Sequence, residues 1–321
     1  MRAIQVRRPG GPEALEPVQL RDPAPGPGEV LVRHRGIGVN FIDVYYRTGL
    51  YPAKAPIIPG MEAAGVVEAV GEGAREFGVG DRVAYATEMG SYAELAAVPE
   101  GRLVPVPEGV TDDAAAAALL QGMTAHYLTH ATFQVRPGQV ALVHAGAGGV
   151  GLLLTQVLRS LGARPITTVS TPEKAALSRA AGAEHVILYT EQDFEAEVLQ
   201  LTAGEGVDVV YDSVGRTTFE KGFRVLKTRG FMVLYGQSSG PVAPLDLGPI
   251  AKGSLFVTRP RLFAYVPDTA ALRDRAAAVY DWIAKGRLEV RIGGGYPLAE
   301  AARAHRDLEG RVTTGKLLLV P

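Results

Sequence analysis

From residue 139 onward, short runs rich in Val, Leu and Ile alternate with amphipathic segments, and this rhythm restricts the fold more than any other feature. The apolar runs begin near residues 139, 165, 185, 207 and 231, and each of the first four precedes a segment with helical periodicity. Strands that are apolar along their whole length and separated by helices are typical of a parallel sheet covered on both faces. The sequence therefore predicts an α/β unit with a doubly wound parallel sheet.

The first of these runs leads directly into a glycine-rich stretch, HAGAGGVG, at residues 144–151. Its spacing, G-x-G-x-x-G, permits a tight turn, close approach of the backbone to a pyrophosphate and close packing of helix on strand. The motif alone is weak, but a strand before it and a helix after it are the context that it requires. The expected pyrophosphate contacts, at the N-terminus of that helix, are Gly146, Gly148, Gly149, Val150 and Gly151.

The end of the second strand distinguishes between the two nicotinamide dinucleotides. NAD-specific sites carry Asp or Glu about 20 residues beyond the glycines, where the carboxylate accepts a hydrogen bond from the ribose 2′-OH. This chain has Ser170 there, with Lys174 one helical turn further on. A 2′-phosphate could accept from both side chains, so the sequence favours NADPH. The alternative is that Ser170 is only the N-cap of the next helix and Lys174 a solvated side chain.

The first third of the chain has the alternating pattern of short antiparallel strands. Residues 1–8 and 29–39 are expected strands, joined by a region rich in proline and glycine, RDPAPGPGE. Further strands are expected at 63–70, 81–86 and 92–98. Such short strands suit a small barrel-like arrangement, so this part should be mainly β.

A helix marks the junction between the two parts. Thr111 is its expected N-cap. Asp112 and Asp113 follow in the first turn, where negative charge interacts favourably with the helix dipole. Beyond the last βα step, helices near 270–285 and 299–308 and a terminal strand depart from the rhythm, which indicates a return to the first part. The expected domains are 1–121 with 259–321, and 122–258.

Composition argues against several other kinds of protein. The net charge is −1 and the basic residues are dispersed, so no nucleic-acid binding is expected. No run reaches the roughly 18 apolar residues of a membrane helix, and Met1–Gly10 lacks the apolar core of a signal peptide. We therefore expect a soluble, cytoplasmic protein. Because the chain has no cysteine, any metal would need histidine and carboxylate ligands.

Three further features allow more than one interpretation. GQSSG at 236–240 fits the G-x-S-x-G pattern of serine hydrolases, but PVAPLDLGP follows where that site needs a helix. His126 and His130 have the spacing of two metal ligands, but no Glu lies between them as in HExxH and no third ligand is evident. The tyrosine-rich segment 40–52 suits either core packing or the wall of an active site.

Over essentially its whole length the chain resembles the quinone oxidoreductase, or zeta-crystallin, branch of the medium-chain dehydrogenase/reductase superfamily. The most specific matching segments are GVNFIDVYYRTGLYP at 38–52 and GSLFVTRP at 253–260. Further matches are PGMEAAGVVEAVGEG, GDRVAY, GMTAHYL, HAGAGGVG and VVYDSVG. The resemblance implies a mainly β, GroES-like, partly open barrel as the catalytic domain, a Rossmann-type NADPH-binding domain, and a nicotinamide site in the cleft between them.

The resemblance also implies an enzyme without zinc. Zinc alcohol dehydrogenases of the superfamily have a Cys at the position of Asn40 and a His at the position of Met61. Their four-cysteine structural-zinc lobe has no counterpart in this chain.

The resemblance further implies where ligands bind. Besides the glycine turn, the expected cofactor contacts are Asn40, Thr124, Ser170, Lys174, Tyr189, Ser213, Gly236 and Ser238. The expected walls of the substrate pocket are Ile42, Asp43, Tyr45 and Tyr51. Asn40 and Tyr51 are the candidate catalytic residues, which would hydrogen bond to the oxygen that gathers charge as a hydride arrives. Gly253–Thr258 would pair across a two-fold axis in a homodimer.

The expected function is NADPH-dependent, zinc-independent reduction of quinones or related conjugated carbonyls. Tyr51 lies at the offset from Asn40 at which related enoyl thioester reductases carry a proton-donating Tyr, so a 2-enoyl thioester or alkenal reductase is the first alternative. The second alternative is an NADPH-binding protein with a structural or RNA-binding role, as among zeta-crystallin-like relatives.

Overall fold

The computed structural model describes residues 1–321, which divide into two compact units. One unit contains Met1–Met123 and Tyr265–Pro321, and the other contains Thr124–Ala264. The divisions fall within two helices, α2 (Asp112–Tyr127) and α8 (Leu262–Tyr265). They lie a few residues beyond the divisions expected after residues 121 and 258.

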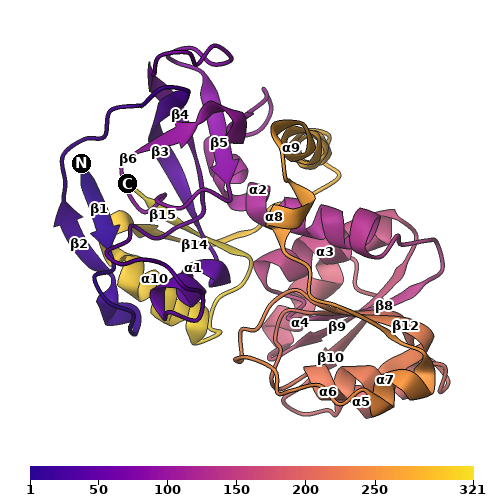
Figure 1. Ribbon diagram of the computed structural model, residues 1–321. Coiled ribbons are helices and arrows are strands. Elements are labelled where there is room, and N and C mark those ends of the chain that lie inside the picture. The colour runs from indigo at the N-terminus through magenta and orange to yellow at the C-terminus, as the bar shows by residue number, and fades with distance from the viewer. The chain divides into compact units, whose positions relative to one another are not determined.

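The unit of residues 124–264 is built on a six-stranded parallel sheet in the order β10-β9-β8-β11-β12-β13 (Figure 1). Its strands are β8 (Val140–His144), β9 (Arg164–Val169), β10 (His185–Leu188), β11 (Val207–Asp212), β12 (Leu226–Leu234) and β13 (Phe256–Thr258). Its helices are α3 (Gly149–Ser160), α4 (Pro172–Ala180), α5 (Phe194–Leu201), α6 (Phe219–Gly222) and α7 (Gly248–Gly253), with a π-helical turn at Leu128–Thr132 and a 3-10 turn at Phe223–Val225.

The apolar runs form these strands because both faces of the sheet are covered. All five residues of β8 are buried, and the sheet's core includes Leu142, Val210 and Met232. The strand order reverses between β8 and β11, which is the switch point of a Rossmann-type sheet. The predicted doubly wound fold is therefore confirmed, although the helix expected after β11 is shortened to a single turn and a 3-10 turn.

The other unit contains a seven-stranded, mainly antiparallel sheet organised around the long strand β3 (Glu29–Val39). The other members are β4 (Glu62–Val70), β5 (Arg82–Ala86), β6 (Leu95–Pro99), β7 (Val104–Pro105), β14 (Ile292–Pro297) and β15 (Lys316–Val320). β3 pairs with β4 over most of its length, with β6 near its start and with β15 at its end. The terminal strand thus returns to the first part, as expected.

Helices and short turns complete this unit. They are α1 (Phe41–Arg47), α9 (Thr269–Ala284) and α10 (Ala301–Glu309), with 3-10 turns at Pro12–Ala14, Glu100–Arg102 and Leu298–Glu300. Thr111 caps α2 as expected, because its hydroxyl accepts a hydrogen bond from the Ala114 amide at 3.1 Å. The first strand, β1 (Arg2–Gln5), pairs with β2 (Glu16–Gln19) in a separate ribbon rather than with β3.

None of the helices combines the length and the apolar character needed to cross a lipid bilayer.

Candidate functional site

The glycine-rich turn lies between β8 and α3, at the carboxyl edge of the parallel sheet. A Cβ on Gly151 would lie 2.2 Å from the Ala145 carbonyl oxygen, and one on Gly146 would lie 2.5 Å from Thr167 Cβ. Ala145 itself has a left-handed backbone, with φ of 56°. Only glycine at 146 and 151 allows the helix to pack this closely on the strands, which is the packing that the fingerprint predicts.

The N-terminus of α3 has the properties of an anion site. Gly148 is its N-cap, and no side chain accepts a hydrogen bond from the first turn. A Cβ on Gly148 would meet the Ala145 carbonyl oxygen at 3.2 Å, a tight contact that a shift of a few tenths of an ångström would relieve. The uncapped amides of Gly149, Val150 and Gly151 and the positive end of a twelve-residue helix favour a phosphate at this point. The turn therefore fits a dinucleotide pyrophosphate.

The residues expected to distinguish NADPH from NADH follow β9 and β10, the two strands on one side of β8. Ser170 comes directly after β9, and Tyr189 comes directly after β10 and is 41% exposed. The N-cap of α4 is Thr171, not Ser170, because the Thr171 hydroxyl accepts from the Lys174 amide at 3.3 Å. The hydroxyl of Ser170 is therefore not needed to cap the helix, and no carboxylate stands at the end of β9.

The ends of β11 and β12 complete this edge of the sheet. Ser213 follows β11, and its carbonyl accepts from the Ser238 amide at 3.0 Å. Gly236 packs against the same residue, since a Cβ there would lie 2.7 Å from the Ser213 carbonyl oxygen. The buried Asp212 orders this loop, because its carboxylate accepts from the amides of Val214 and Gly215. The topology thus gathers Ser170, Tyr189 and Ser213 at the carboxyl ends of parallel strands, whereas Thr124 lies in α2 and is 6% exposed.

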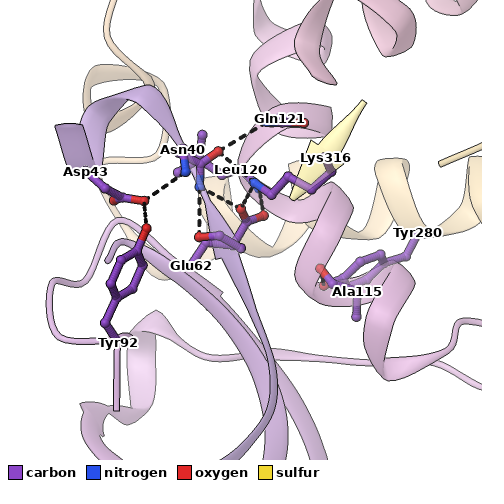
Figure 2. A network of polar contacts seen from close by, with 10 residues as sticks. Asn40, Asp43, Glu62, Tyr92, Ala115, Leu120, Gln121, Tyr280 and Lys316 are labelled. Atoms are coloured by element: carbon purple, nitrogen blue, oxygen red, sulfur yellow. Dashed lines mark hydrogen bonds and ion pairs between the residues drawn. The ribbon is translucent and has the colours of Figure 1, made fainter. Parts of the chain in front are cut away.

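In the other unit, Asn40 directly follows β3 and forms the N-cap of α1. Its side chain is 4% exposed and fully engaged (Figure 2). The amide oxygen accepts from Lys316 Nζ at 2.7 Å and from Gln121 Nε2 at 3.3 Å, and the amide nitrogen donates to Glu62 Oε2 at 2.9 Å. The amide is held by three side chains, so Asn40 is not available to a substrate unless one of these bonds opens.

Glu62 and Lys316 form a fully buried ion pair beside Asn40, with side-chain exposures of 0% and 1%. Glu62 begins β4 and Lys316 begins β15, and Glu62 Oε1 also accepts from the Leu120 amide of α2 at 2.6 Å. A buried pair of this kind is destabilising to break, because the remaining charge would lack a partner. Figure 2 shows Glu62, Lys316 and Gln121 meeting Asn40 from separate elements.

Asp43, expected to wall the substrate pocket, has no exposed surface. Its Oδ2 accepts from the backbone amide of Asn40 at 2.8 Å and from the Tyr92 hydroxyl at 3.0 Å. Its Oδ1 is buried without a partner. Burial raises the pKa of Asp43 to about 7, although these two donors and the Lys316 ammonium oppose the rise. Asp43 therefore fixes the first turn of α1 from within the protein.

The tyrosines of segment 40–52 pack on one another. The ring of Tyr51 lies 5.2 Å from that of Tyr45 and 5.7 Å from that of Tyr46, between ring centres. Tyr45 is buried, whereas Ile42 and Tyr51 are partly exposed. Both interpretations of this segment therefore apply in part, because Tyr45 packs in the interior while Ile42 and Tyr51 reach the surface.

The weaker motifs have structural explanations. GQSSG is followed by irregular chain up to α7, which agrees with the expectation that it is not a hydrolase turn. His126 and His130 stack, with ring centres 4.4 Å apart, at the junction of α2 and the π-helical turn. The structure contains no cluster of three His, Asp or Glu residues able to hold a metal ion.

Sequence reasoning missed the partners of Asn40. Lys316 and Glu62 lie 276 and 22 residues from it along the chain, so no local spacing connects them. The available signal was a charged residue at the edge of an apolar run, as in Lys316 before LLLV. Such a residue needs a buried partner of opposite charge, although the sequence does not say which one.

Known proteins match the chain in both sequence and structure. The alcohol dehydrogenase GroES-like domain matches residues 26–108, and the zinc-binding dehydrogenase family matches residues 181–319. The quinone oxidoreductase of Pseudomonas aeruginosa is 47% identical over 321 residues, which cover 99% of each chain. The 2-haloacrylate reductase of a Burkholderia species is 41% identical, over 99% of this chain and 98% of that protein.

A solved structure gives the same result. Escherichia coli quinone oxidoreductase complexed with NADPH superposes with a TM-score of 0.98 at 40% identity, over the full length of both chains. The chain is therefore an oxidoreductase, and it belongs to the quinone oxidoreductase branch of the medium-chain dehydrogenase/reductase superfamily.

Proposed function

We propose that the protein is an NADPH-dependent reductase of quinones and related conjugated carbonyls that works without zinc. The observation that carries the proposal is the carboxyl edge of the parallel sheet, where an uncapped helix follows a turn that only glycine permits. The end of β9 offers Ser170 and, one turn on, Lys174, where an NAD site would carry a carboxylate. Relatives named quinone oxidoreductase, one of them solved with NADPH, support the same assignment.

The chain's own residues would hold NADPH in defined roles. The amides of Gly149, Val150 and Gly151 would bind the pyrophosphate, and Ser170 and Lys174 the 2′-phosphate. When bound, NADPH supplies a hydride. A quinone that accepts it gathers negative charge on oxygen, so the protein must orient the ring and donate a hydrogen bond there. Of the two candidates, Tyr51 suits this role better, because it is partly exposed, whereas Asn40 is buried and its side-chain amide is held by three side chains.

The residues do not fit a catalytic zinc ion. Catalytic zinc needs three protein ligands drawn from Cys, His and carboxylates. The chain has no cysteine, no cluster of three candidate ligands, and an amide at position 40 whose oxygen faces the Lys316 ammonium. We infer that activity does not depend on a metal and that dialysis against a strong chelator leaves it unchanged.

Reduction of a conjugated carbon–carbon double bond is the second candidate function. The relative named 2-haloacrylate reductase favours it, since a haloacrylate has such a bond next to a carboxylate. That reaction needs a proton delivered to carbon, whereas a quinone needs little acid assistance. Tyr51 is the residue whose removal should separate the two reactions.

Steady-state NADPH oxidation tests both candidates. Benzoquinone, naphthoquinone, an alkenal and an enoyl-CoA are compared with the wild type, Tyr51→Phe and the neighbouring control Tyr46→Phe. We expect quinones to be the fastest acceptors and Tyr51→Phe to lower kcat for them by less than about tenfold. Loss of quinone reduction in Tyr51→Phe alone would show that the residue is essential. Tight NADPH binding without oxidation by any acceptor would favour a non-catalytic binding protein.

We also propose that two copies pair through β13. This strand ends the parallel sheet and pairs only with β12, and its Phe256 and Val257 are 46% and 37% exposed. An open strand edge carrying apolar side chains is a ready site for pairing with a second copy. Light scattering should give a dimer for the wild type and a monomer for Val257→Lys. A dimer that persists in that variant would argue for another interface.

A further inference from the structure

A chain of buried polar contacts extends from Asp43 to the surface at Glu309. Tyr92 donates to Asp43 at 3.0 Å, and its hydroxyl oxygen lies 2.9 Å from His305 Nε2. The other ring nitrogen, His305 Nδ1, lies 3.1 Å from Arg47 Nη1. Arg47 in turn makes two bonds to Glu309, at 2.7 and 2.9 Å. Tyr92 and His305 are 0% exposed and Arg47 is 1% exposed, whereas Glu309 reaches solvent.

From Arg47 inward, each donor of this chain points toward Asp43. A guanidinium has no acceptor, so Arg47 donates to His305 Nδ1, and a neutral imidazole then carries its proton on Nε2. His305 therefore donates to Tyr92, and the Tyr92 hydroxyl is directed onto Asp43. Burial, and then the Arg47 charge, lower the pKa of His305 to about 3, so the ring is neutral. Arg47 does not lose its proton, so the chain orients groups and does not conduct protons.

A second buried Tyr–His pair in the same unit has the opposite hydrogen-bond sense. His34 Nδ1 lies 2.7 Å from the Ala93 carbonyl oxygen, which only accepts, so His34 carries its proton there. The Tyr85 hydroxyl therefore donates to His34 Nε2, at 2.9 Å. This pair ends at a backbone carbonyl and makes no hydrogen bond to Asp43. It is an internal control with equal burial and similar chemistry, since Tyr85 is 1% and His34 4% exposed.

We propose that Tyr92 and His305 are positioning residues of the reductase site, which hold Asp43 ionised and through it fix Asn40 and the start of α1. The inference rests on the proposed function, because α1 carries Ile42 and Tyr45 of the expected substrate wall. Other charged groups also act on Asp43. Glu62 on β4 opposes its ionisation and Lys316 on β15 favours it, while Arg47, on α1 itself, is bound to Glu309 of α10.

The experiment follows the acidic limb of the pH profile of quinone kcat/KM at saturating NADPH, between about pH 5.5 and 9. The limb reports the loss of the Asp43 charge, since burial places the pKa of Asp43 at about 7. In Tyr92→Phe, which lacks the donor to Asp43, the limb should move up by about one pH unit. Tyr85→Phe should leave the limb in place while losing a similar amount of thermal stability.

Two substitutions of His305 distinguish its role as hydrogen-bond donor to Tyr92 from a role in packing alone. Gln places its amide nitrogen near the position of His Nε2, so His305→Gln retains a donor to Tyr92 and should keep the wild-type limb. Asn reaches only to the position of Nδ1, so His305→Asn keeps an acceptor for Arg47, loses the donor and should move the limb upward. An unmoved limb in Tyr92→Phe, or an equal shift in Tyr85→Phe, would overturn the proposal.

A carboxyl ¹³C NMR titration keeps the test independent of turnover. The Asp43 signal is assigned by its absence in Asp43→Asn, and its midpoint should rise in Tyr92→Phe and not in Tyr85→Phe. If the wild type reduces no quinone, the proposed function fails, and the titration still decides whether Tyr92 holds Asp43 ionised. If quinones are reduced but the midpoint does not rise, the positioning role fails alone.

Discussion

At the scale of single residues, Ser170 is the residue that we propose decides between NADPH and NADH. It stands at the end of β9, outside the helix cap that Thr171 provides. A carboxylate there would repel a 2′-phosphate and accept from a ribose 2′-OH. Ser170→Asp should therefore weaken NADPH binding by about 100-fold, or about 2.7 kcal/mol, and reverse the preference toward NADH.

Fluorescence titration with both dinucleotides measures this change. Ser170→Ala is the matched control, since it removes the hydroxyl without adding charge and should weaken NADPH binding by about tenfold or less. An unchanged NADPH dissociation constant in Ser170→Asp would show that the 2′-phosphate binds elsewhere.

Single residues also mark the limit of what the sequence predicts. Asn40, the only asparagine of the chain, was identified as a candidate within a family-specific segment. Its hydrogen bonds to Lys316 and Gln121, however, form only because β15 and α2 lie beside it in the fold. Asp43 was expected at the pocket wall because its neighbours match that segment, and the structure buries it completely. Which way a side chain points from a seven-residue helix depends on tertiary packing, which local pattern does not encode.

At the scale of elements, the turn between β8 and α3 contains glycines with two different roles: Gly151 allows the helix to pack on the strand, and Gly148 leaves room for the ligand. A Cβ at Gly151 would meet the Ala145 carbonyl oxygen at 2.2 Å, whereas one at Gly148 would meet it at 3.2 Å. Gly151→Ala should therefore destabilise the protein by about 2 kcal/mol or more, because the helix must move off the strand. Gly148→Ala should lower the melting temperature little but weaken NADPH binding, because its methyl group would lie at the pyrophosphate position.

Thermal unfolding and NADPH titration of the two variants measure these effects. Equal losses of stability in both would contradict the division of roles between the two glycines.

Elements that are distant in sequence are joined by the buried Glu62–Lys316 pair. It connects β4 and β15, and Asn40 and Leu120 extend the connection to the end of β3 and the middle of α2. Lys316→Met leaves the Glu62 charge buried without its partner and should cost about 3–5 kcal/mol of stability. Adding Glu62→Gln should recover part of that loss by removing the orphan charge.

Urea unfolding of the single and double variants gives the coupling energy of the pair. The control is Lys285→Met, which breaks an exposed pair with Asp281 and should change stability by less than about 1 kcal/mol. A Lys316→Met variant as stable as this control would mean that the buried pair contributes nothing.

At the scale of the whole molecule, the fold was more predictable than the site. The βα rhythm from residue 139 specified the parallel sheet, because each buried strand is a continuous apolar run such as VALVH in β8. The β unit was harder to derive, since its sheet joins β3 to β15 across most of the chain. The pairing of β1 with β2 was also missed, because the alternation of residues 1–8 does not say which strand lies beside them.

The stability of the whole molecule should depend on pH through its buried histidines. Burial lowers the pKa of His34 to about 4 and that of His305 to about 3, and it also lowers the pKa of His144. In the unfolded chain each histidine takes up a proton below about pH 6.5, whereas in the folded protein it does not. Between pH 6.5 and 4 the unfolded state therefore binds more protons, and stability falls as the pH falls.

Asp43 acts in the opposite direction. Its folded pKa of about 7 lies above its unfolded value, so the folded state holds an extra proton between about pH 4 and 7, and stability rises as the pH falls through this range. From pH 7 to 5, His34 and His305 should together lower the free energy of unfolding by about 4 kcal/mol, and Asp43 should raise it by about 2 kcal/mol. The free energy of unfolding should therefore be lower at pH 5 by about 2 kcal/mol, with His144 adding to the loss.

Urea unfolding at the two pH values tests this balance. In His34→Gln, which removes one titrating ring but keeps an acceptor for Tyr85, the loss on acidification should shrink by about 2 kcal/mol. The matched control is His185→Gln, at a partly exposed histidine outside the core. If His34→Gln and His185→Gln gave the same pH dependence, the acid loss would have to come from groups other than the buried His34.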